Sequence, residues 1–332
     1  MENKKILITG IAGFIGSHLA DELLARGYKV CGIDNLSMGK IENIEHNLSN
    51  PQFVFKKIDV RNLSLLKETA SDSVAIVHLA AFKIPRYGNS LDTLLINTKG
   101  TENVFEVAKE IGCKVIFAST SDVYGKNPNL PFKEDSNLVY GPSNIARWSY
   151  AVSKLFDEHM AFGYQESFGI PVVILRFFGA YGPRQHLSWW GGPQSVFISA
   201  ILKDEEIQIH GDGTQRRTFI YIEDLIYGVM AAIERKDAIG EIFNLGTTEE
   251  ISILDLARLI KKLCDTKDEI RLKFVPYSSL SSNYEDVRRR IPDIAKAQSI
   301  LGFQPKINLR EGIKMTIGWQ RNILGKIPVT EK

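Results

Sequence analysis

The sequence predicts an α/β fold in which a doubly wound parallel sheet carries a smaller C-terminal lobe. Short β-branched runs alternate with amphipathic helical stretches along the first half of the chain, and a glycine-rich turn follows the first run. Strands that alternate with helices form parallel sheets with both faces covered. The chain has 332 residues, 44% of them hydrophobic and 24% charged, so it can bury a large core.

The expected elements follow from hydrophobic periodicity, read from the N-terminus. Ile6-Leu-Ile-Thr9 is strand-like, residues 14–26 have helical periodicity, and Lys29-Val-Cys-Gly-Ile33 is the next strand, so these residues open a βαβ unit. Further strands are expected at residues 53–55, 74–77, 114–117 and 172–175. Further helices are expected at residues 91–111, 150–168, 222–234, 253–263 and 309–322.

The composition changes after Phe177, where loops rich in Gly, Pro, Trp and Gln begin, as in Trp189-Trp-Gly-Gly-Pro193. We therefore expect a nucleotide-binding domain at residues 1–178, with a later contribution from about 219–247. Residues 179–332 are expected to form mainly the second lobe. Folds of this class bind ligands at the carboxyl ends of the strands, between the lobes.

Charge and cysteine content exclude several classes of protein. The 41 basic and 39 acidic side chains leave a net charge of +2, which argues against a nucleic-acid or membrane surface. Cys31, Cys113 and Cys264 lie far apart without metal-ligand spacing, so we expect a reduced compartment and no metal site. Neither a signal peptide nor a membrane-spanning stretch is apparent, and a cytoplasmic location is expected.

Gly10-Ile-Ala-Gly13-Phe-Ile-Gly16 follows a strand and opens a helix. The backbone N–H groups of such a turn and the helix N-terminus can bind the pyrophosphate of a dinucleotide, which indicates a Rossmann-like domain. Asp34 ends the second strand, where a carboxylate accepts hydrogen bonds from the adenosine ribose and repels a 2′-phosphate, so NAD is favoured over NADP. Alternatively, the three glycines only allow close helix packing.

Asp59-Val60 follows the next strand, at a place suited to the adenine edge, although Asp59 is nearly as well explained as a helix cap. Tyr150 and Lys154 are four residues apart and share a helix face. A lysine ammonium beside a phenol lowers the pKa of that phenol, as a general base requires. Thr120, at a strand end, can share the proton with Tyr150, whereas an ordinary turn is the alternative explanation of Ser119-Thr-Ser121.

With these motifs the chain resembles the extended short-chain dehydrogenase/reductase family, specifically its NAD-dependent nucleotide-sugar epimerases, dehydratases and decarboxylases. The matching segments are Thr9-Gly-Ile-Ala-Gly-Phe-Ile-Gly16, His78-Leu-Ala-Ala81, Asn97-Thr-Lys-Gly-Thr101, Ser119-Thr-Ser-Asp-Val-Tyr-Gly125, Tyr150-Ala-Val-Ser-Lys154, Arg176-Phe-Phe, Tyr181-Gly-Pro-Arg184 and Gly211-Asp-Gly-Thr-Gln-Arg-Arg-Thr-Phe-Ile-Tyr221. The resemblance implies that Tyr150 deprotonates the sugar 4-hydroxyl while the C4 hydride passes to NAD⁺, which gives a transient 4-ketose. It implies that Lys154 also binds the nicotinamide ribose.

The same resemblance suggests the remaining binding residues. Arg217 and Arg288 match positions at which the family grips the nucleotide diphosphate, a role suited to guanidinium groups. Lys83 and Asn97 match positions that line the cofactor and substrate cleft. Further cofactor contacts are expected from Phe14, Ile15, Asn35, Leu79, Ala80, Ala81 and Ser119, and further substrate contacts from Phe178, Gly179 and Gln194.

Local residues discriminate among the family's reactions. Asp122 stands where dehydratases and decarboxylases of the family carry Glu, and Ser121 argues against dehydration, because dehydratases place an acid there. The segments Gly141-Pro-Ser-Asn-Ile-Ala-Arg147 and Tyr284-Glu-Asp-Val-Arg-Arg-Arg290 resemble those of UDP-glucuronate decarboxylases and UDP-apiose/xylose synthases. In both groups the two matching arginines are associated with a C6 carboxylate. A 4-ketone β to that carboxylate permits loss of CO₂ while arginines hold it in place.

Alternatives stay open. Arg147 can equally cap a loop, and residues 288–290 can form a solvated face. Asp122 is shorter than the family Glu, Gly179 replaces an Asn of many epimerases, and Gln194 stands near an Arg of several decarboxylases. We therefore expect a UDP-hexuronate decarboxylase, with a UDP-sugar 4-epimerase as the close competitor and a catalytically silent NAD-binding protein as the third possibility. The resemblance also implies a homodimer formed by helices 91–111 and 150–168.

Overall fold

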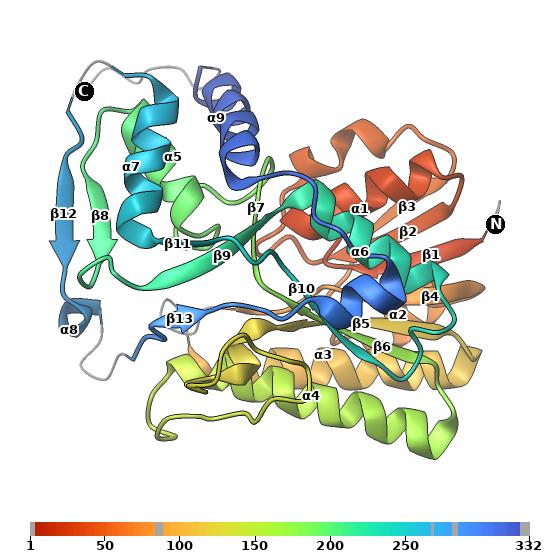
Figure 1. Ribbon diagram of the computed structural model, residues 1–332. Coiled ribbons are helices and arrows are strands. Elements are labelled where there is room, and N and C mark those ends of the chain that lie inside the picture. The colour runs from red at the N-terminus through yellow and green to blue at the C-terminus, as the bar shows by residue number, and fades with distance from the viewer. Residues whose placement is uncertain (1–3, 84–88, 267–268, 281–284, 326–332) are drawn as a thin grey trace.

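The computed structural model describes residues 4–83, 89–266, 269–280 and 285–325. Its centre is a seven-stranded parallel sheet with the strand order β10-β6-β5-β4-β1-β2-β3 (Figure 1). The strands are β1 (Lys5–Thr9), β2 (Lys29–Asp34), β3 (Phe53–Lys57), β4 (Ser73–His78), β5 (Lys114–Thr120), β6 (Val172–Phe177) and β10 (Ile242–Leu245). The order reverses between β1 and β4, where doubly wound sheets form their binding crevice. The predicted Rossmann-like fold is confirmed.

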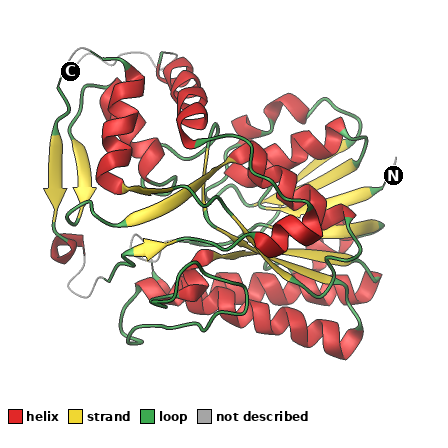
Figure 2. Ribbon diagram, in the orientation of Figure 1, coloured by secondary structure: helices red, strands yellow, loops and turns green. Residues whose placement is uncertain are grey.

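Helices cover both faces of this sheet (Figure 2). On one face lie α1 (Phe14–Ala25) and α6 (Ile222–Glu234), and on the other lie α2 (Leu63–Ala70), α3 (Ser90–Ile111) and α4 (Arg147–Phe168). Strand β1 is consequently buried on both sides: Ile6 and Ile8 belong to one apolar cluster and Leu7 to the other. A strand with two buried faces is a continuous hydrophobic run, as the sequence of β1 is.

Local signals explain where several helices begin and end. The Asn89 side chain accepts a hydrogen bond from the Leu91 amide and so caps α3, while Gly112 and Gly169 end α3 and α4 in the left-handed conformation. The helix expected at residues 150–168 begins earlier, at Arg147, which places that arginine one turn before Tyr150. A short helix that the sequence did not predict, η4 (Ser121–Tyr124), follows β5 directly.

The second lobe contains two small sheets. In one, β9 (Arg216–Tyr221) pairs with β7 (Gly179–Tyr181), β11 (Glu250–Ser252) and β13 (Arg289–Arg290); in the other, β8 (Ile207–His210) pairs with β12 (Leu272–Val275). The helices of this lobe are α5 (Pro193–Leu202), α7 (Ile253–Cys264), α8 (Tyr277–Leu280) and α9 (Leu309–Leu324). The chain also forms short helical turns at η1 (Ile41–Asn43), η2 (Glu45–Asn47) and η5 (Ala297–Leu301). Of these, η1 and η2 lie between β2 and β3 of the central sheet. The boundary near residue 178 stays a prediction.

Three features bear on the expectations from composition. Cys31, Cys113 and Cys264 are buried free thiols. Among the described residues, side chains of His, Cys, Asp and Glu form no group that could hold a metal ion. Within the same part of the chain, every helix is too short or too polar to cross a membrane.

Candidate active site

A large cavity of about 1260 Å³ lies at the carboxyl ends of the central strands and extends to residues of the second lobe. Pockets for one small molecule usually measure about 300–1,000 Å³, so this cavity has room for a dinucleotide and a second ligand together. It is lined by the glycine-rich turn, by the ends of β2, β4 and β5, and by side chains from α4, α5 and β9. Every predicted site residue lines it except Asn97 and Arg288.

The glycine-rich turn requires glycine at two of its positions. Gly10 has a φ of +76°, and a Cβ there would lie 2.9 Å from the Ala80 amide nitrogen. A Cβ at Gly16 would lie 2.3 Å from the Gly10 carbonyl oxygen, which is closer than any real contact. The turn can therefore bring its backbone against β4 and open α1 toward the cavity. These residues fit the pyrophosphate of a dinucleotide at a helix N-terminus.

Two carboxylates were predicted at the adenosine end. The buried Asp34 accepts hydrogen bonds from the Ala12 amide at 3.1 Å and the Leu36 amide at 2.8 Å. Burial raises its pKa, against the opposing effect of those two amides. Asp59 is bound at both oxygens by the Arg61 side chain, at 2.8 and 2.7 Å, and accepts a third bond from Asn35. Asp59 thus forms a local turn at the cavity wall. The helix-cap explanation is wrong, because Asn62 caps α2, and a contact of Asp59 with adenine stays a prediction.

Tyr150 and Lys154 both line the cavity from α4, as the four-residue spacing predicts. The Thr120 hydroxyl hydrogen-bonds the Tyr150 phenol from the end of β5. The expected lowering of the phenol pKa is wrong for this structure. Burial raises the pKa of Tyr150, the negative charges of Asp122 and Asp157 raise it further, and only the bond with Thr120 opposes them.

Lys154 is a buried cation, with 2% of its side chain exposed. Its Nζ lies 4.6 Å from the centre of the Phe117 ring. Burial lowers the pKa of Lys154 to about 8, while the nearby carboxylates of Asp157 and Glu158 act in the opposite direction. Lysine without such burial has a pKa near ~10.4, so this side chain loses its proton much closer to neutral pH.

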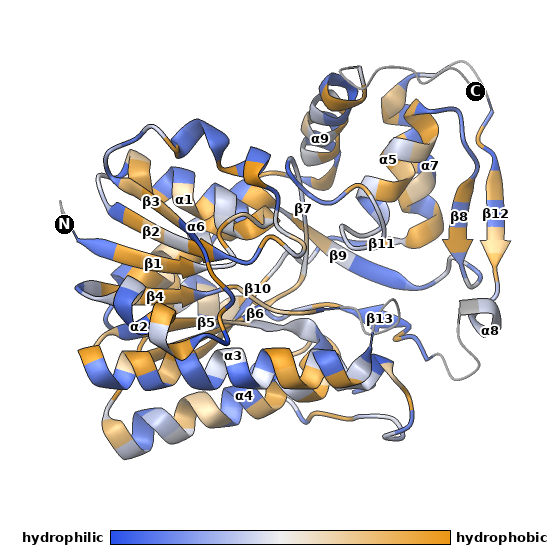
Figure 3. Cartoon of the chain, turned by 180° about the vertical axis from the view of Figure 1, so that it is seen from behind, coloured by the Kyte–Doolittle hydropathy of each residue, from blue (hydrophilic) through white to orange (hydrophobic). Residues whose placement is uncertain are grey.

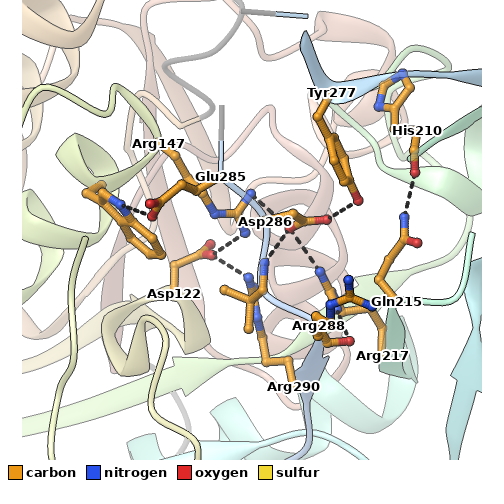
Figure 4. Close-up of polar contacts among 12 residues, drawn as sticks. Asp122, Arg147, His210, Gln215, Arg217, Tyr277, Glu285, Asp286, Arg288 and Arg290 are labelled. Atoms are coloured by element: carbon orange, nitrogen blue, oxygen red, sulfur yellow. Dashed lines mark hydrogen bonds and ion pairs between the residues drawn. The ribbon is translucent and has the colours of Figure 1, made fainter. Parts of the chain in front are cut away.

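Five charged side chains meet at the other end of the cavity, and we call them the arginine cluster: Asp122, Arg147, Arg217, Asp286 and Arg290 (Figure 4). Arg290 Nη2 lies 2.7 Å from Asp122 Oδ1, and Arg147 Nη2 lies 3.6 Å from the same oxygen. Arg147 Nη1 and Arg217 Nη2 lie 3.2 and 3.1 Å from Asp286 Oδ1. Three guanidinium groups thus face two carboxylates, which leaves one positive charge unbalanced within the cluster.

The pKa values in the cluster follow from these pairs. Burial opposes ionisation of Asp122, but Arg290, Arg147 and Arg217 outweigh it and lower its pKa. Asp286 is held well below its ordinary pKa in the same way, by Arg147 and Arg217 against burial. Burial lowers the pKa of Arg217 to about 10, so this guanidinium is still charged at neutral pH. Asp122, Asp286 and Arg217 are therefore charged at neutral pH.

Asp286 is the functional candidate that sequence reasoning missed. Besides the two arginines it binds the Tyr277 hydroxyl, which donates to Asp286 Oδ2 at 2.9 Å, and both residues line the cavity. A possible signal was its position two residues before the run Arg288-Arg289-Arg290, in a segment already noted for its arginines. Tyr284, the first residue of that segment, lies outside the described residues.

The two predicted residues that do not line the cavity have other contacts. Asn97 is buried; its Oδ1 accepts from the Phe82 amide at 2.7 Å, and its Nδ2 donates to the Ser153 hydroxyl at 3.0 Å. It therefore holds the backbone of Phe82, the residue before Lys83, and a contact of Asn97 with a ligand stays a prediction. Arg288 is exposed, and its backbone carbonyl accepts hydrogen bonds from the Arg216 amide and the Arg217 side chain. A contact of the Arg288 side chain with the diphosphate stays a prediction.

The remaining predicted contacts lie between these two ends. Phe178 is buried against Tyr124, and a Cβ on Gly179 would lie 2.9 Å from the Phe219 ring. Gln194, at the start of α5, is only 1% exposed, and its Nε2 has no hydrogen-bond partner among the described residues. Of the two tryptophans in this region, Trp189 stacks on the His210 ring at 4.1 Å between centroids.

Comparison with known proteins places this geometry in a family. The family model described as GDP-mannose 4,6 dehydratase matches residues 7–316. The chain is 36% identical over 323 residues to the UDP-N-acetyl-alpha-D-glucosaminuronate decarboxylase of Bacillus cytotoxicus, covering 96% of this chain and 98% of that one. It is also 36% identical to UDP-glucuronic acid decarboxylase 1 of Xenopus tropicalis, covering 97% of this chain and 73% of the relative.

Among solved structures, the chain resembles the UDP-glucuronic acid 4-epimerase of Bacillus cereus in complex with UDP-glucuronic acid and NAD. The TM-score is 0.85 and the identity 34%, with 96% of this chain and 99% of that chain covered. A UDP-glucose 4-epimerase from Thermotoga maritima gives a TM-score of 0.86 at 30% identity, covering 96% and 99% of the two chains. The family model matches residues 7–316, and the two decarboxylases are 36% identical to nearly the whole chain. The chain therefore belongs to the GDP-mannose 4,6-dehydratase-like family of extended short-chain dehydrogenase/reductase enzymes.

Proposed function

We propose that this protein is an NAD-dependent decarboxylase of a UDP-hexuronate, acting through a transient 4-ketose. The arginine cluster is the observation that carries the proposal. It adds an unbalanced positive charge to the cavity that contains Tyr150 and Lys154, which suits a sugar with a carboxylate at C6. Two of the relatives above are decarboxylases of such uronates, at 36% identity.

The residues that would hold NAD are the glycine-rich turn, whose amides face the pyrophosphate, Asp34 at the adenosine ribose and Lys154 at the nicotinamide ribose. When bound, NAD⁺ would supply a reversible hydride acceptor for C4 of the sugar, so that no external oxidant would be consumed.

The chain's own residues account for the other steps. Tyr150 accepts the proton of the C4 hydroxyl, and Thr120 holds the phenol in place by the hydrogen bond described above. In the resulting 4-keto acid the C5–C6 bond breaks, its electron pair moves toward the C4 oxygen, and CO₂ leaves. A proton is then added at C5. The buried charge of Lys154 favours the enolate oxygen, because that oxygen develops negative charge in the cavity that Lys154 lines.

The arginines orient the carboxylate that leaves. Arg290 and Arg147 now bind Asp122, and Arg147 and Arg217 bind Asp286. A substrate carboxylate and diphosphate can enter this cluster only by sharing those guanidinium groups, each of which presents several donors in a fixed fork. We assign Arg290 and Arg147 to the carboxylate and Arg217 to the diphosphate.

A second candidate is 4-epimerisation of the same kind of uronate. It is favoured by the solved UDP-glucuronic acid 4-epimerase, which is 34% identical to this chain. Both candidates use a C6 carboxylate, so the arginine cluster supports the substrate class for either one. Dehydration is disfavoured by Ser121 and a silent NAD-binding protein by the intact Tyr150 and Lys154 pair. The test of the first candidate is release of CO₂ from UDP-glucuronate by purified protein with NAD⁺, without conversion of UDP-glucose.

We also propose a homodimer formed by α3 and α4. These helices pack side by side and expose apolar side chains one turn apart, Leu91 and Leu95 on α3 and Val152 and Phe156 on α4. Orange apolar segments are visible along both helices in Figure 3. Exposed apolar residues grouped on one surface are typical of an interface. A cytoplasmic location stays a prediction.

A further inference from the structure

A buried chain of hydrogen bonds connects the cavity wall at Ala80 with Asp157, on the side of α4 next to Lys154. The Ala80 amide donates to Thr9 Oγ1 at 3.1 Å, and Thr9 Oγ1 lies 2.7 Å from His78 Nδ1. On the other side of the ring, His78 Nε2 lies 3.2 Å from Thr101 Oγ1, which donates to Asp157 Oδ2 at 2.9 Å. All four side chains are buried.

The Asp157 end of this chain sets the direction of its bonds. A hydroxyl has a single hydrogen, and Thr101 gives its hydrogen to Asp157, so the Thr101 oxygen must accept from His78 Nε2–H. Burial lowers the pKa of His78 well below the ordinary value, so the ring is neutral and its proton is on Nε2. His78 Nδ1 therefore accepts from the Thr9 hydroxyl, whose oxygen accepts from the Ala80 amide.

A chain with this direction stabilises Asp157 as a carboxylate. Each N–H or O–H dipole points toward Asp157, and aligned hydrogen bonds in a buried site polarise one another. A hydrogen bond donated to a carboxylate is stronger than one donated to a neutral carboxyl group, so the Thr101 bond favours the ionised form of Asp157. The buried carboxylate is thus held ionised in spite of its desolvation.

Asp157 is also the carboxylate best placed to balance Lys154. The other nearby carboxylate, Glu158, is bound at both oxygens by Arg176, at 3.0 and 2.7 Å, and by the Ser119 hydroxyl. Asp157 is 0% exposed, and its Oδ1 has no hydrogen-bond partner among the residues that the structure describes. Its charge is therefore not neutralised by an arginine, unlike that of Glu158.

We propose that Asp157 is a positioning residue that keeps Lys154 protonated, and that the chain Thr9–His78–Thr101 keeps Asp157 ionised. The proposal rests on the proposed function only in that Lys154 is used in catalysis. Neither the effect of Asp157 on Lys154 nor the effect of the Thr9–His78–Thr101 chain on Asp157 needs a bound ligand.

The surroundings of the pair include few other charges. On α4 itself, Tyr150 and Glu158 lie beside Lys154 and Asp157; β4 contributes the neutral His78, and β6 contributes Arg176, which is occupied by Glu158. From α3 the facing group is the Thr101 hydroxyl, and from η4 it is Asp122, whose charge acts on Tyr150.

The pKa values agree with the geometry. Burial raises the pKa of Asp157 to about 6, against the effects of Lys154 and the Thr101 bond. Lys154 has its pKa lowered to about 8, as described. Both groups are therefore ionised between about pH 6 and pH 8. Below this window Asp157 takes up a proton, and above it Lys154 loses one.

The test measures Lys154 directly. Lysine residues carrying ¹³C at Cε are titrated by NMR in the protein without added ligands, and Lys154→Arg identifies the Lys154 signal. Asp157→Asn removes the counter-charge without changing the shape of the side chain. We expect the pKa of Lys154 to fall by at least about one unit, because an opposite charge within ~4–6 Å typically shifts a buried group this much. Glu102→Gln, on the exposed side of α3, is the matched control and should leave Lys154 unchanged.

A second measurement keeps the proposal testable if Asp157→Asn does not fold. The ¹⁵N shifts of His78 should show the Nε2–H form with an unprotonated Nδ1 throughout pH 5–9. Thr101→Val should move the proton uptake of Asp157, seen in the Lys154 shift, to higher pH. An unchanged Lys154 pKa in folded Asp157→Asn, or an Nδ1–H form of His78, would overturn the proposal. Neither readout depends on turnover, so failure here is distinct from failure of the proposed function.

Discussion

Arg290 and Asp122 form an ion pair of 2.7 Å across the cavity, between β13 in the second lobe and η4 at the end of a central strand. The same arginine donates to the Ser121 hydroxyl at 3.3 Å. An anionic sugar that reaches the catalytic residues must therefore be recognised by a guanidinium that already holds a carboxylate. On the proposed function, we therefore expect selection of a uronate to depend most on Arg290.

Replacement of Arg290 by Ala should remove that selection. Loss of one partner of a buried, hydrogen-bonded charge pair costs ~2–5 kcal/mol, and we expect kcat/KM for UDP-glucuronate to fall by about 100-fold or more. Steady-state kinetics of CO₂ release provide the measurement. Arg289→Ala is the matched control, because Arg289 is the adjacent residue, exposed and paired with Glu250. Equal activity of the two variants would remove Arg290 from the proposed role.

Tyr150→Phe should abolish turnover while the protein remains folded. General acid–base groups typically contribute ~10²–10⁴-fold, and the phenol is the group we expect to take the C4 proton. The decrease should appear in kcat, with substrate binding retained in a calorimetric titration. Tyr227→Phe, which removes an exposed hydroxyl far from the cavity lining, should behave as wild type. Residual activity near the wild-type rate would mean that another group accepts the proton.

Much of this site could be predicted from sequence because its motifs are local. The glycine turn, the Tyr150 and Lys154 spacing and the alternation of strands with helices all follow from patterns within a few residues. The role of Asp286 could not, because its partners Arg147 and Arg217 come from other parts of the chain and only the folded protein brings them together. No pattern within a few neighbouring residues indicates which side chains of different elements will form an ion pair.

The incorrect expectations share that origin. Spacing alone places Lys154 on the same face as Tyr150, but whether the lysine lowers the phenol pKa depends on burial and on Asp122 and Asp157, which raise it. Asn97 has the residue type of a ligand, yet its amide is used by Phe82 and Ser153. In each case part of the competing environment comes from another element, Asp122 of η4 for Tyr150 and Ser153 of α4 for Asn97.

Gly16→Ala should weaken cofactor binding severely, because its Cβ would lie 2.3 Å from the Gly10 carbonyl and the turn would have to open. We expect loss of NAD binding measured by fluorescence titration. Gly318→Ala is the control: it lies inside α9, and an added Cβ meets nothing within 4 Å. That change should stabilise the protein by ~0.5–1 kcal/mol in denaturant unfolding. Full NAD affinity in Gly16→Ala would contradict the assigned turn geometry.

Phe156→Asp should convert the proposed dimer into a monomer. The side chain is 54% exposed on α4, and a charge at the centre of an apolar interface is costly to bury. Light scattering after size exclusion gives the mass directly. Phe274→Asp, at an equally exposed site on β12, should leave the mass unchanged. A wild-type mass of one chain at micromolar concentration would refute the dimer.

The most direct test of the central claim follows the carboxylate carbon. UDP-glucuronate labelled with ¹³C at C6 is incubated with the purified protein and NAD⁺, and ¹³C and proton NMR are recorded together. We predict ¹³CO₂ and bicarbonate signals, with a new UDP-pentose anomeric signal appearing at the same rate. A galacto-configured product that keeps its labelled carboxylate would instead establish 4-epimerisation, and it would contradict decarboxylation by this site.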